Sequence, residues 1–423
     1  CTTYASIRRG RAGRLLRSAS RQREPRMDHK AYRQLLRERV GLRDLPFDES
    51  EYRGRHEALA ARLAESGLDA LLITDAADIC YLTGYNTFEV SVHTALLAAA
   101  DRLVLQVPSI ETGPAVTGSR VDEVMGYRWE GAAGAVAQLA GAIGDLGAGD
   151  GAIGVDDWSA GLRPALRQGL QEALPRARLV DASGLVDGLR IIKSPAELAY
   201  LGESARLTRA GIDAAAATVR PGVSDQTIAA AAAEAMLAGG SEFMSMQPIV
   251  TAGWRSSVIH TNHRRHEVAA GDPVFLELGA CWQRYTAPLM HTVIAGTPTA
   301  DMVAIHRRCR AVYEAVTAAM RPGESFDQAA AAAEAALEPD AHRVFFSGVF
   351  GYTVGVQFPP SWVEGSGFIA RGETRTFEEN MVFHLPLCLR LPGAWGIGVS
   401  ETVRVTPNGA EPITNNDWTL RKR

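Results

Sequence analysis

The sequence predicts an α/β domain over residues 42–188, followed by an α+β domain with an internal repeat over residues 189–423. Three observations support this prediction. The 423-residue chain is long enough for two or three domains, and its 46% apolar and 22% charged residues are typical of a globular protein. Helix-like and strand-like patterns alternate up to residue 188. Beyond that point, one helix–helix–strand pattern occurs twice.

The first 26 residues differ in composition from the rest of the chain. They are rich in Arg and Ser and contain one acidic residue, Glu24. Such a composition is also typical of a transit peptide. Because Met27 stands where the composition changes, we interpret residues 1–26 as a disordered tail or as translated sequence upstream of a natural start. We expect residues 1–41 to be disordered or extended.

The region from residue 42 to residue 188 alternates between helices and strands. Glu51–Ser66 places apolar and charged side chains at helical spacing, and Leu68–Thr74 is a short, mostly apolar run of the kind found in buried strands. Further strands are expected at Leu103–Val107, Ala152–Val155 and Ala177–Val180, and further helices at Ala132–Leu146 and Gly161–Leu174. This alternation predicts the α/β domain.

The second domain begins with a long helix, expected from about Pro195 to Val219. The sequence RPGVSDQTIAAA of residues 220–231 is echoed by RPGESFDQAAA of residues 321–331. In each copy Pro-Gly stops one helix, and Ser-Asp or Ser-Phe-Asp caps the next. Strands are expected after each copy, at Met246–Thr251, Pro273–Leu278, Tyr285–Ala295, Val344–Val356, Met381–Leu389 and Glu401–Thr406. The echo indicates a duplicated unit around a pseudo-twofold axis; the alternative is chance similarity between Ala-rich helices.

Composition also narrows the expected partners and compartment. A net charge of −4 gives no electrostatic footprint for nucleic acid. No apolar run approaches the roughly 18 residues of a membrane span. The five cysteines are scattered without paired spacing, which favours reduced thiols in a cytoplasmic protein. We therefore expect a cytoplasmic protein whose partners are neither nucleic acid nor membrane.

Several motifs in the right order resemble the pita-bread superfamily, which includes creatinase and the Xaa-Pro peptidases. They are LTGY (residues 82–85), IKSPAEL (192–198), ELG (277–279), MVFHLP (381–386) and SETVRVT (400–406). The segments ELGACWQRYTAPLMHT and GYTVGVQFPPSW resemble the metal-free ectoine hydrolase branch of that superfamily. The resemblance implies a creatinase-like N-terminal domain and a pita-bread catalytic domain.

The same resemblance allows the superfamily's five metal-ligand positions to be located in this sequence. Four of them carry Glu277, Pro288, Tyr352 and Pro386, and the fifth carries Glu401 or the adjacent Ser400, because the register is uncertain by one residue. A hard divalent ion would therefore lack most of its ligands. We expect no metal and no other cofactor.

Hydrolysis without metal requires a nucleophile and proton carriers. Glu277 lies in an apolar strand pattern, where a carboxylate is costly unless a ligand neutralises it. The resemblance implies that Glu277 acts as nucleophile and that His260 transfers protons. Strand alternation places His384 on the same face as Pro386, toward the site, where we expect a second proton carrier or a substrate contact. The structural alternatives are a hydrogen-bonded strand acid, a loop histidine and a core histidine.

Five further residues are candidates for substrate binding: Tyr352, Glu401, His93, Tyr285 and Trp362. Each of them could instead be structural, as a core aromatic, an ion-pair partner or a loop residue. The resemblance implies a homodimer in which His93 approaches the active site of the partner subunit. His291 departs from the arginine that the superfamily places there, which leaves the substrate open.

We therefore predict a metal-independent C–N hydrolase that opens a small cyclic amidine such as ectoine. The sequence does not distinguish ectoine from hydroxyectoine, a guanidine or another amidine. One alternative is an Xaa-Pro dipeptidase or aminopeptidase of the metallopeptidase type, which requires ligands that this sequence lacks. The other is an inactive pseudo-peptidase that serves as a binding module.

Overall fold

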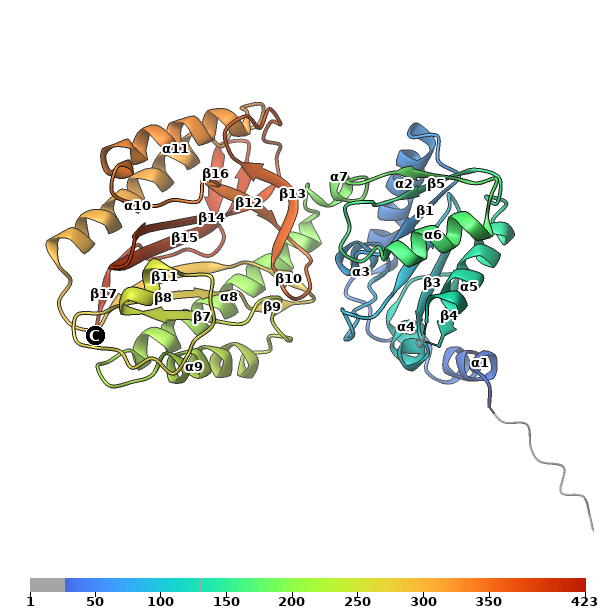
Figure 1. The fold of residues 1–423 in the computed structure, drawn as a ribbon, viewed down its shortest axis with the longest axis horizontal. Helices are drawn as coiled ribbons and strands as arrows, with labels where there is room; N and C mark the ends of the chain where they lie inside the picture. The colour runs from blue at the N-terminus through green and yellow to red at the C-terminus, as the bar shows by residue number, and fades with distance from the viewer. Residues whose placement is uncertain (1–26, 129–130) are drawn as a thin grey trace, which may run out of the picture.

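The computed structural model describes residues 27–128 and 131–423, which form two domains joined by the short helix α7 (Asp187–Arg190) (Figure 1). The predicted tail of residues 1–26 lies outside the described residues. The prediction that disorder extends to residue 41 is wrong, because His29–Arg39 forms helix α1. Asp28 caps this helix by accepting a hydrogen bond from the Ala31 amide, and Arg37 donates to the Asp122 carbonyl.

The N-terminal domain is a six-stranded mixed sheet with helices packed against it (Figure 1). The strand order is β4-β3-β2-β1-β5-β6, in which β2 runs antiparallel to both of its neighbours. The strands are β1 (Ala70–Ile73), β2 (Ala95–Ala98), β3 (Leu103–Pro108), β4 (Glu123–Tyr127), β5 (Ala152–Val155) and β6 (Arg178–Asp181). The helices are α2 (Glu49–Glu65), α3 (Ala76–Thr83), η1 (Ser109–Glu111), α4 (Thr112–Gly118), α5 (Ala132–Asp145) and α6 (Pro164–Ala173).

The C-terminal domain contains two larger sheets, each covered by a pair of long helices, and a small two-stranded sheet of β9 and β10 (Figure 1). The first unit contains α8 (Pro195–Thr218), α9 (Asp225–Ala238), β7 (Ile249–Ala252), η2 (Gly253–Ser257), β8 (Pro273–Leu278), β9 (Cys281–Trp282), β10 (Tyr285–Thr286) and β11 (Leu289–Ile294). The second contains α10 (Ala300–Ala319), α11 (Phe326–Ala341), β12 (Gly351–Val354), β13 (Val363–Ile369), β14 (Val382–Leu391), β15 (Trp395–Thr406) and β16 (Gly409–Pro412). Strand β17 (Arg421–Lys422) returns to pair with β11.

The predicted duplication is confirmed by equivalent contacts in the two units. Ser224 caps α9 and Ser325 caps α11, each by accepting a hydrogen bond from the amide three residues on. The acidic residue that follows each cap holds a loop of its own unit. Asp225 accepts bonds from the Arg264 and His266 amides, and Asp327 accepts a bond from the Gly372 amide. The RPG-Ser-Asp echo therefore encodes one structural device used twice.

The two units meet where β11 lies beside β15. Thr292 exchanges hydrogen bonds with Gly398, donating to its carbonyl and accepting from its amide, both at 2.9 Å. Thr402 donates to the Pro288 carbonyl at 2.7 Å. A Cβ atom at Gly398 would lie 2.2 Å from the Phe275 ring, so only glycine permits this approach of β15 to β8. This seam brings the strands of both units to one site.

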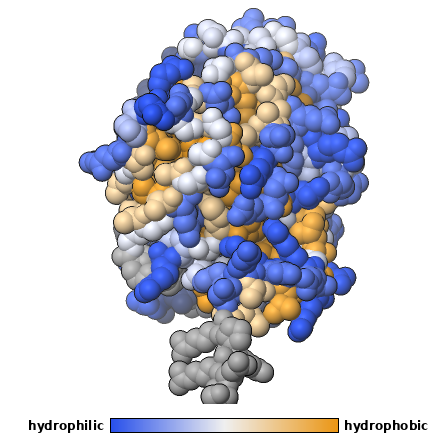
Figure 2. Space-filling model, turned by 90° about the vertical axis from the view of Figure 1, so that its right-hand side faces the viewer, coloured by the Kyte–Doolittle hydropathy of each residue, from blue (hydrophilic) through white to orange (hydrophobic). Residues whose placement is uncertain are grey.

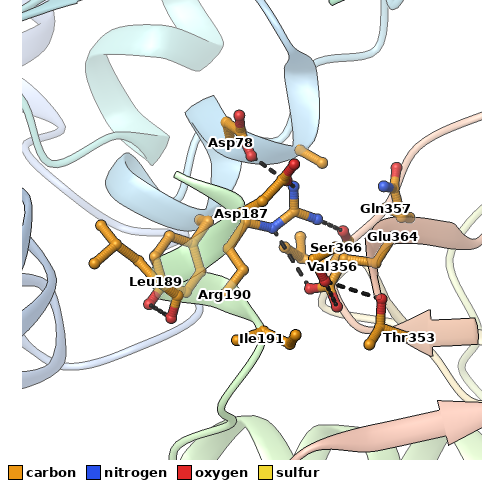
Figure 3. A network of polar contacts seen from close by, with 12 residues as sticks. Asp78, Asp187, Leu189, Arg190, Ile191, Thr353, Val356, Gln357, Glu364 and Ser366 are labelled. Atoms are coloured by element: carbon orange, nitrogen blue, oxygen red, sulfur yellow. Dashed lines mark hydrogen bonds and ion pairs between the residues drawn. The ribbon is translucent and has the colours of Figure 1, made fainter. Parts of the chain in front are cut away.

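A buried polar network connects the two domains (Figure 3). Arg190 of α7 pairs with Asp78 of α3 at 2.5 Å and donates to the Val356 carbonyl at 2.6 Å. On its other side, Glu364 of β13 pairs with Arg190 at 3.6 Å and with Lys193 at 2.7 Å. Polar side chains cover much of the outer face of the N-terminal domain, with apolar strips between them (Figure 2).

Two further expectations from the sequence were unpaired cysteines and the lack of a membrane-spanning segment. Cys80, Cys281, Cys309 and Cys388 are all buried and unpaired. Within residues 27–128 and 131–423, no helix combines the length and the apolar composition needed to cross a bilayer.

Candidate active site

Glu277 is the last but one residue of β8 and lies between Ile249 of β7 and Met290 of β11. Its side chain shares a strand face with Phe275 and is 4% exposed. The carboxyl group makes no hydrogen bond and no ion pair with any residue that the structure describes. Burial raises the pKa of Glu277 to about 8, because a desolvated carboxylate has no cation to stabilise it.

The surroundings of Glu277 are apolar. Ile249, Phe275, Met290 and Cys388 form one buried cluster, and partly buried Met246 and Ile259 pack against it. An unpaired acid in an apolar cluster is costly for folding and is a common feature of functional sites. The site therefore combines one carboxyl group, which can become negatively charged, with apolar walls that suit the hydrocarbon part of a ligand.

His384 lies in β14 and belongs to a series of hydrogen-bonded side chains on the same side of the domain as Glu277. Its Nδ1 atom is 2.7 Å from the Tyr352 hydroxyl, and its Nε2 atom is 2.7 Å from Ser400 Oγ. The imidazole is fully buried, and burial lowers the pKa of His384 to about 3. His384 is therefore a neutral ring at ordinary pH.

Tyr352 and Trp362, both expected to contact substrate, extend this chain. The Trp362 indole N–H donates to the Tyr352 hydroxyl at 2.9 Å. Burial and then the nearby charge of Glu277 raise the pKa of Tyr352 well above its ordinary value. Trp362 is completely buried, and a Cβ atom at Gly279 would lie 3.0 Å from its ring. Trp362 therefore positions Tyr352 rather than forming an exposed aromatic wall.

The structure resolves the register at the last ligand position in favour of Ser400. Ser400 pairs with Pro386 across β14 and β15, and its Oγ lies beside His384. Glu401 projects from the opposite face of β15, where its carboxylate accepts hydrogen bonds from Thr414 Oγ1 and from the Asn416 amide. Glu401 is thus bound by the C-terminal segment and does not join the Glu277 cluster, contrary to its assignment as a substrate ligand.

Two of the three remaining predicted residues lie away from Glu277, and the third, His260, is next in sequence to a residue that packs against the apolar cluster. Tyr285 donates to Glu197 of its own domain at 2.9 Å and accepts from Arg55 of the N-terminal domain at 3.5 Å, so its hydroxyl is engaged at the domain interface. His93 is buried in the N-terminal domain, with Nε2 3.0 Å from Gln106 Oε1. His260 is exposed at a backbone φ of 42°, directly after Ile259, which packs against the apolar cluster. Only His260 of these three borders the site.

The sequence did not predict the hydrogen bond of Ser400 to His384, nor the apolar walls formed by Ile249, Met290 and Cys388. Strand alternation carried the missing signal for Ser400, because Pro386 pairs with it and His384 shares its strand face. The walls come from three different strands and depend on register.

His291 has a fully buried ring with Nδ1 3.2 Å from Asn416 Oδ1, and burial, together with Arg421, lowers its pKa to about 4.

The side chains at the superfamily's metal-ligand positions do not fit a metal pair. Pro288 and Pro386 have no donor atom, and the Tyr352 hydroxyl and Ser400 Oγ are both bonded to His384. Glu277 is the one remaining carboxylate. Across the two described ranges, no group of three or more His, Cys, Asp or Glu side chains is arranged to hold a metal ion. No step of the chemistry is therefore derived through a metal.

Comparisons with known proteins identify both domains. Residues 55–192 match the creatinase/prolidase N-terminal domain, and residues 199–407 match metallopeptidase family M24. The ectoine hydrolase of Halomonas elongata is 24% identical, over 88% of this chain and 97% of that protein. The probable dipeptidase PepE of Mycobacterium tuberculosis is 28% identical, over 87% of this chain and 96% of that protein.

The solved structures agree on the fold. The Xaa-Pro dipeptidase of Bacillus anthracis superposes with a TM-score of 0.76 at 21% identity, covering 88% of this chain and all of that one. At that identity the likeness establishes the architecture alone. The similar proteins therefore include both an ectoine hydrolase and dipeptidases.

Proposed function

We propose that this chain, which belongs to the pita-bread superfamily, is a metal-independent hydrolase that opens a small cationic C–N substrate, such as the cyclic amidine ectoine. The product would be of the N-acetyl-diaminobutyrate type. The observation that carries the proposal is the carboxyl group of Glu277, buried in an apolar cluster without a partner. A cation entering this site would supply the missing charge.

The chemistry follows from the charges of the two reactants. A protonated amidine shares its positive charge between two nitrogen atoms and leaves the carbon between them electrophilic, so an adjacent carboxylate attracts the cation and can attack that carbon. Glu277 acts as nucleophile in this scheme. His260, at the rim of the site, exchanges protons with water, while the Tyr352–His384–Ser400 chain faces the substrate from the second unit. After the attack, the ring C–N bond breaks and its nitrogen leaves as an amine that takes a proton from His260. Water then adds to the carbon bound to Glu277, the bond from that carbon to the Glu277 oxygen breaks, and the carboxylate and the N-acyl product separate.

Ionisation of Glu277 is linked to binding of the cation. Because its pKa is raised to about 8, Glu277 is mostly protonated in the empty site at pH 7. A bound cation lowers that pKa and releases a proton. The apparent affinity for a permanently cationic ligand should therefore rise between pH 6 and pH 8 and level off above about pH 8. Calorimetry in buffers of different ionisation enthalpy would count the proton released.

Metallopeptidase activity is the second candidate, since the relatives include dipeptidases. Turnover of ectoine after exhaustive chelation separates the two. We expect chelated wild-type protein to retain full activity and Glu277→Gln to lose at least about 10³-fold in kcat. Glu111→Gln, which changes a buried carboxylate bonded to Tyr85 in the N-terminal domain, is the matched control. Manganese-dependent cleavage of an Xaa-Pro dipeptide, without amidine turnover, would establish the peptidase instead.

Assembly forms a separate part of the proposal. We propose a homodimer, with exposed apolar side chains such as Phe88 and Val90, beside His93, at the contact. Light scattering gives the mass in solution. A monomeric protein with full activity would exclude any requirement for a partner subunit. Absence of turnover with every amidine, guanidine and dipeptide, together with a recovered protein partner, would favour a binding module.

A further inference from the structure

An unbranched chain of hydrogen bonds, from the Trp362 indole to the Met290 amide, lies beside Glu277. The Trp362 indole nitrogen is 2.9 Å from the Tyr352 hydroxyl, which is 2.7 Å from His384 Nδ1. His384 Nε2 is 2.7 Å from Ser400 Oγ, and the Met290 amide nitrogen is 2.6 Å from that same oxygen. The chain thus runs from an indole to a backbone amide through two hydroxyls and one imidazole.

Both ends of this chain donate inward, and this fixes the number of protons inside it. An indole N–H and a backbone N–H are donors only. Between them, the two hydroxyls and the neutral imidazole carry three hydrogen-bonding protons, whereas the Tyr–His and His–Ser links use two. One hydroxyl proton is therefore left over, and it belongs either to Tyr352 or to Ser400, depending on the tautomer of His384.

The surroundings of the two hydroxyls decide between these tautomers. If His384 carried its proton on Nε2, Ser400 would have to point its own proton away from the ring. Ser400 is completely buried, and no other acceptor lies within hydrogen-bond distance of it among the described residues. An orphaned buried hydroxyl costs roughly 1–3 kcal/mol. With the proton on Nδ1, both ring nitrogens and Ser400 are satisfied.

The free proton then belongs to Tyr352, which is only partly buried and which senses the charge of Glu277. Tyr352 and Glu277 are not hydrogen-bonded to each other, so the hydroxyl proton of Tyr352 is not taken up by the Glu277 carboxyl group. We propose that Tyr352 points its hydroxyl proton into the Glu277 site, and that Ser400 and His384, as the Nδ1–H tautomer, are positioning residues that keep it there.

This inference deepens the proposed function and rests on it for the nature of the ligand. A site with one carboxylate and one fixed hydroxyl donor selects a cation that also bears a hydrogen-bond acceptor, such as a carboxylate oxygen. His384 acts through Tyr352 and need not become charged.

Nitrogen-15 NMR of histidine-labelled, ligand-free full-length protein tests the hydrogen-bond direction directly. The His384 signals are assigned by their loss in His384→Gln. We expect a protonated Nδ1 and an unprotonated Nε2 in the wild-type protein, and a switch to Nε2–H in Tyr352→Phe, because only Ser400 then remains as an acceptor. Thr402→Val, which removes a hydroxyl two residues from Ser400 on the same strand face, should leave the tautomer unchanged. An Nε2–H tautomer in the wild-type protein overturns the inference.

Binding supplies the second arm of the test. Acetamidinium is a cation without a carboxylate, whereas ectoine carries one. We expect Tyr352→Phe to weaken ectoine binding at least 10-fold and to leave acetamidinium binding within 2-fold. Equal weakening of both ligands would contradict the donor role of Tyr352. If neither ligand binds to wild-type protein that shows the Nδ1–H tautomer, the proposed substrate class is wrong while the hydrogen-bond direction stands.

Discussion

The junction between the domains and the Glu277 site treat buried charge in opposite ways. At the junction, Arg190 pairs with Asp78 and Glu364 (Figure 3). Glu364 also accepts from Lys193. Burial alone would favour a neutral arginine, but the carboxylates of Asp78 and Glu364 outweigh it and raise the pKa of Arg190. In the Glu277 site, a carboxylate of similar burial has no partner.

This difference separates a structural region from a ligand site. Charges removed from water must be compensated, and the junction compensates them within the folded chain. Glu277 is left uncompensated, so a ligand can supply the missing charge and recover the desolvation cost upon binding. Three variants test whether the contrast is real, and each is measured both as a free energy of unfolding and as activity.

Arg190→Met should have the largest effect on stability. It removes the shared partner of Asp78 and Glu364 while keeping the volume of the side-chain stem. Breaking a buried ion pair on one side costs about 3–5 kcal/mol, because the other charge stays buried. Urea unfolding measures the loss. Arg176→Met, which breaks an exposed pair with Asp150, is the control and should change stability by less than 1 kcal/mol. Similar losses in both variants would remove the contrast.

Glu277→Gln should stabilise the protein at high pH, in contrast to Arg190→Met, and the size of this effect should depend on pH. The pKa of Glu277 is about 8 in the folded protein and near 4.5 when unfolded, so the native state binds the extra proton. Its contribution is fully present below pH 4.5 and is lost as pH rises through 8. We expect the variant to be more stable than wild type at pH 9 by up to several kcal/mol, at about 1.4 kcal/mol per pKa unit. If the variant differed from wild type by the same free energy of unfolding at pH 5 and at pH 9, the result would contradict a buried, unpaired Glu277.

The sequence predicted the architecture well because its signals are local. The Ser caps and Pro-Gly stops of the repeats, and the apolar runs of the central strands, each specify an element without reference to the rest of the chain. Strand β13 was missed because its two glycines weaken the pattern. The predicted strand Tyr285–Ala295 is interrupted because Pro288 has no amide hydrogen for the ladder.

The site was only partly predictable because its members depend on pairing between distant segments. Glu277 stood out as an acid within an apolar strand, and alternation placed His384 beside Pro386. The choice between Ser400 and Glu401 required the register of β14 against β15, which one residue of slip would reverse. The contact of Tyr285 with Glu197 could not be predicted, because Glu197 lies 88 residues earlier in the chain, on α8.

His260→Asn should have the smallest effect on stability and a clear effect on turnover. His260 is exposed and has φ 42°, a conformation that asparagine also tolerates, so unfolding should change by less than about 0.5 kcal/mol. Loss of a proton carrier lowers kcat by about 10²–10⁴-fold. His263→Asn, two residues beyond Thr261 in the same polar loop, is the matched control. If both variants keep full turnover, the proton carrier lies elsewhere, and the Tyr352 hydroxyl becomes the first group to test in its place.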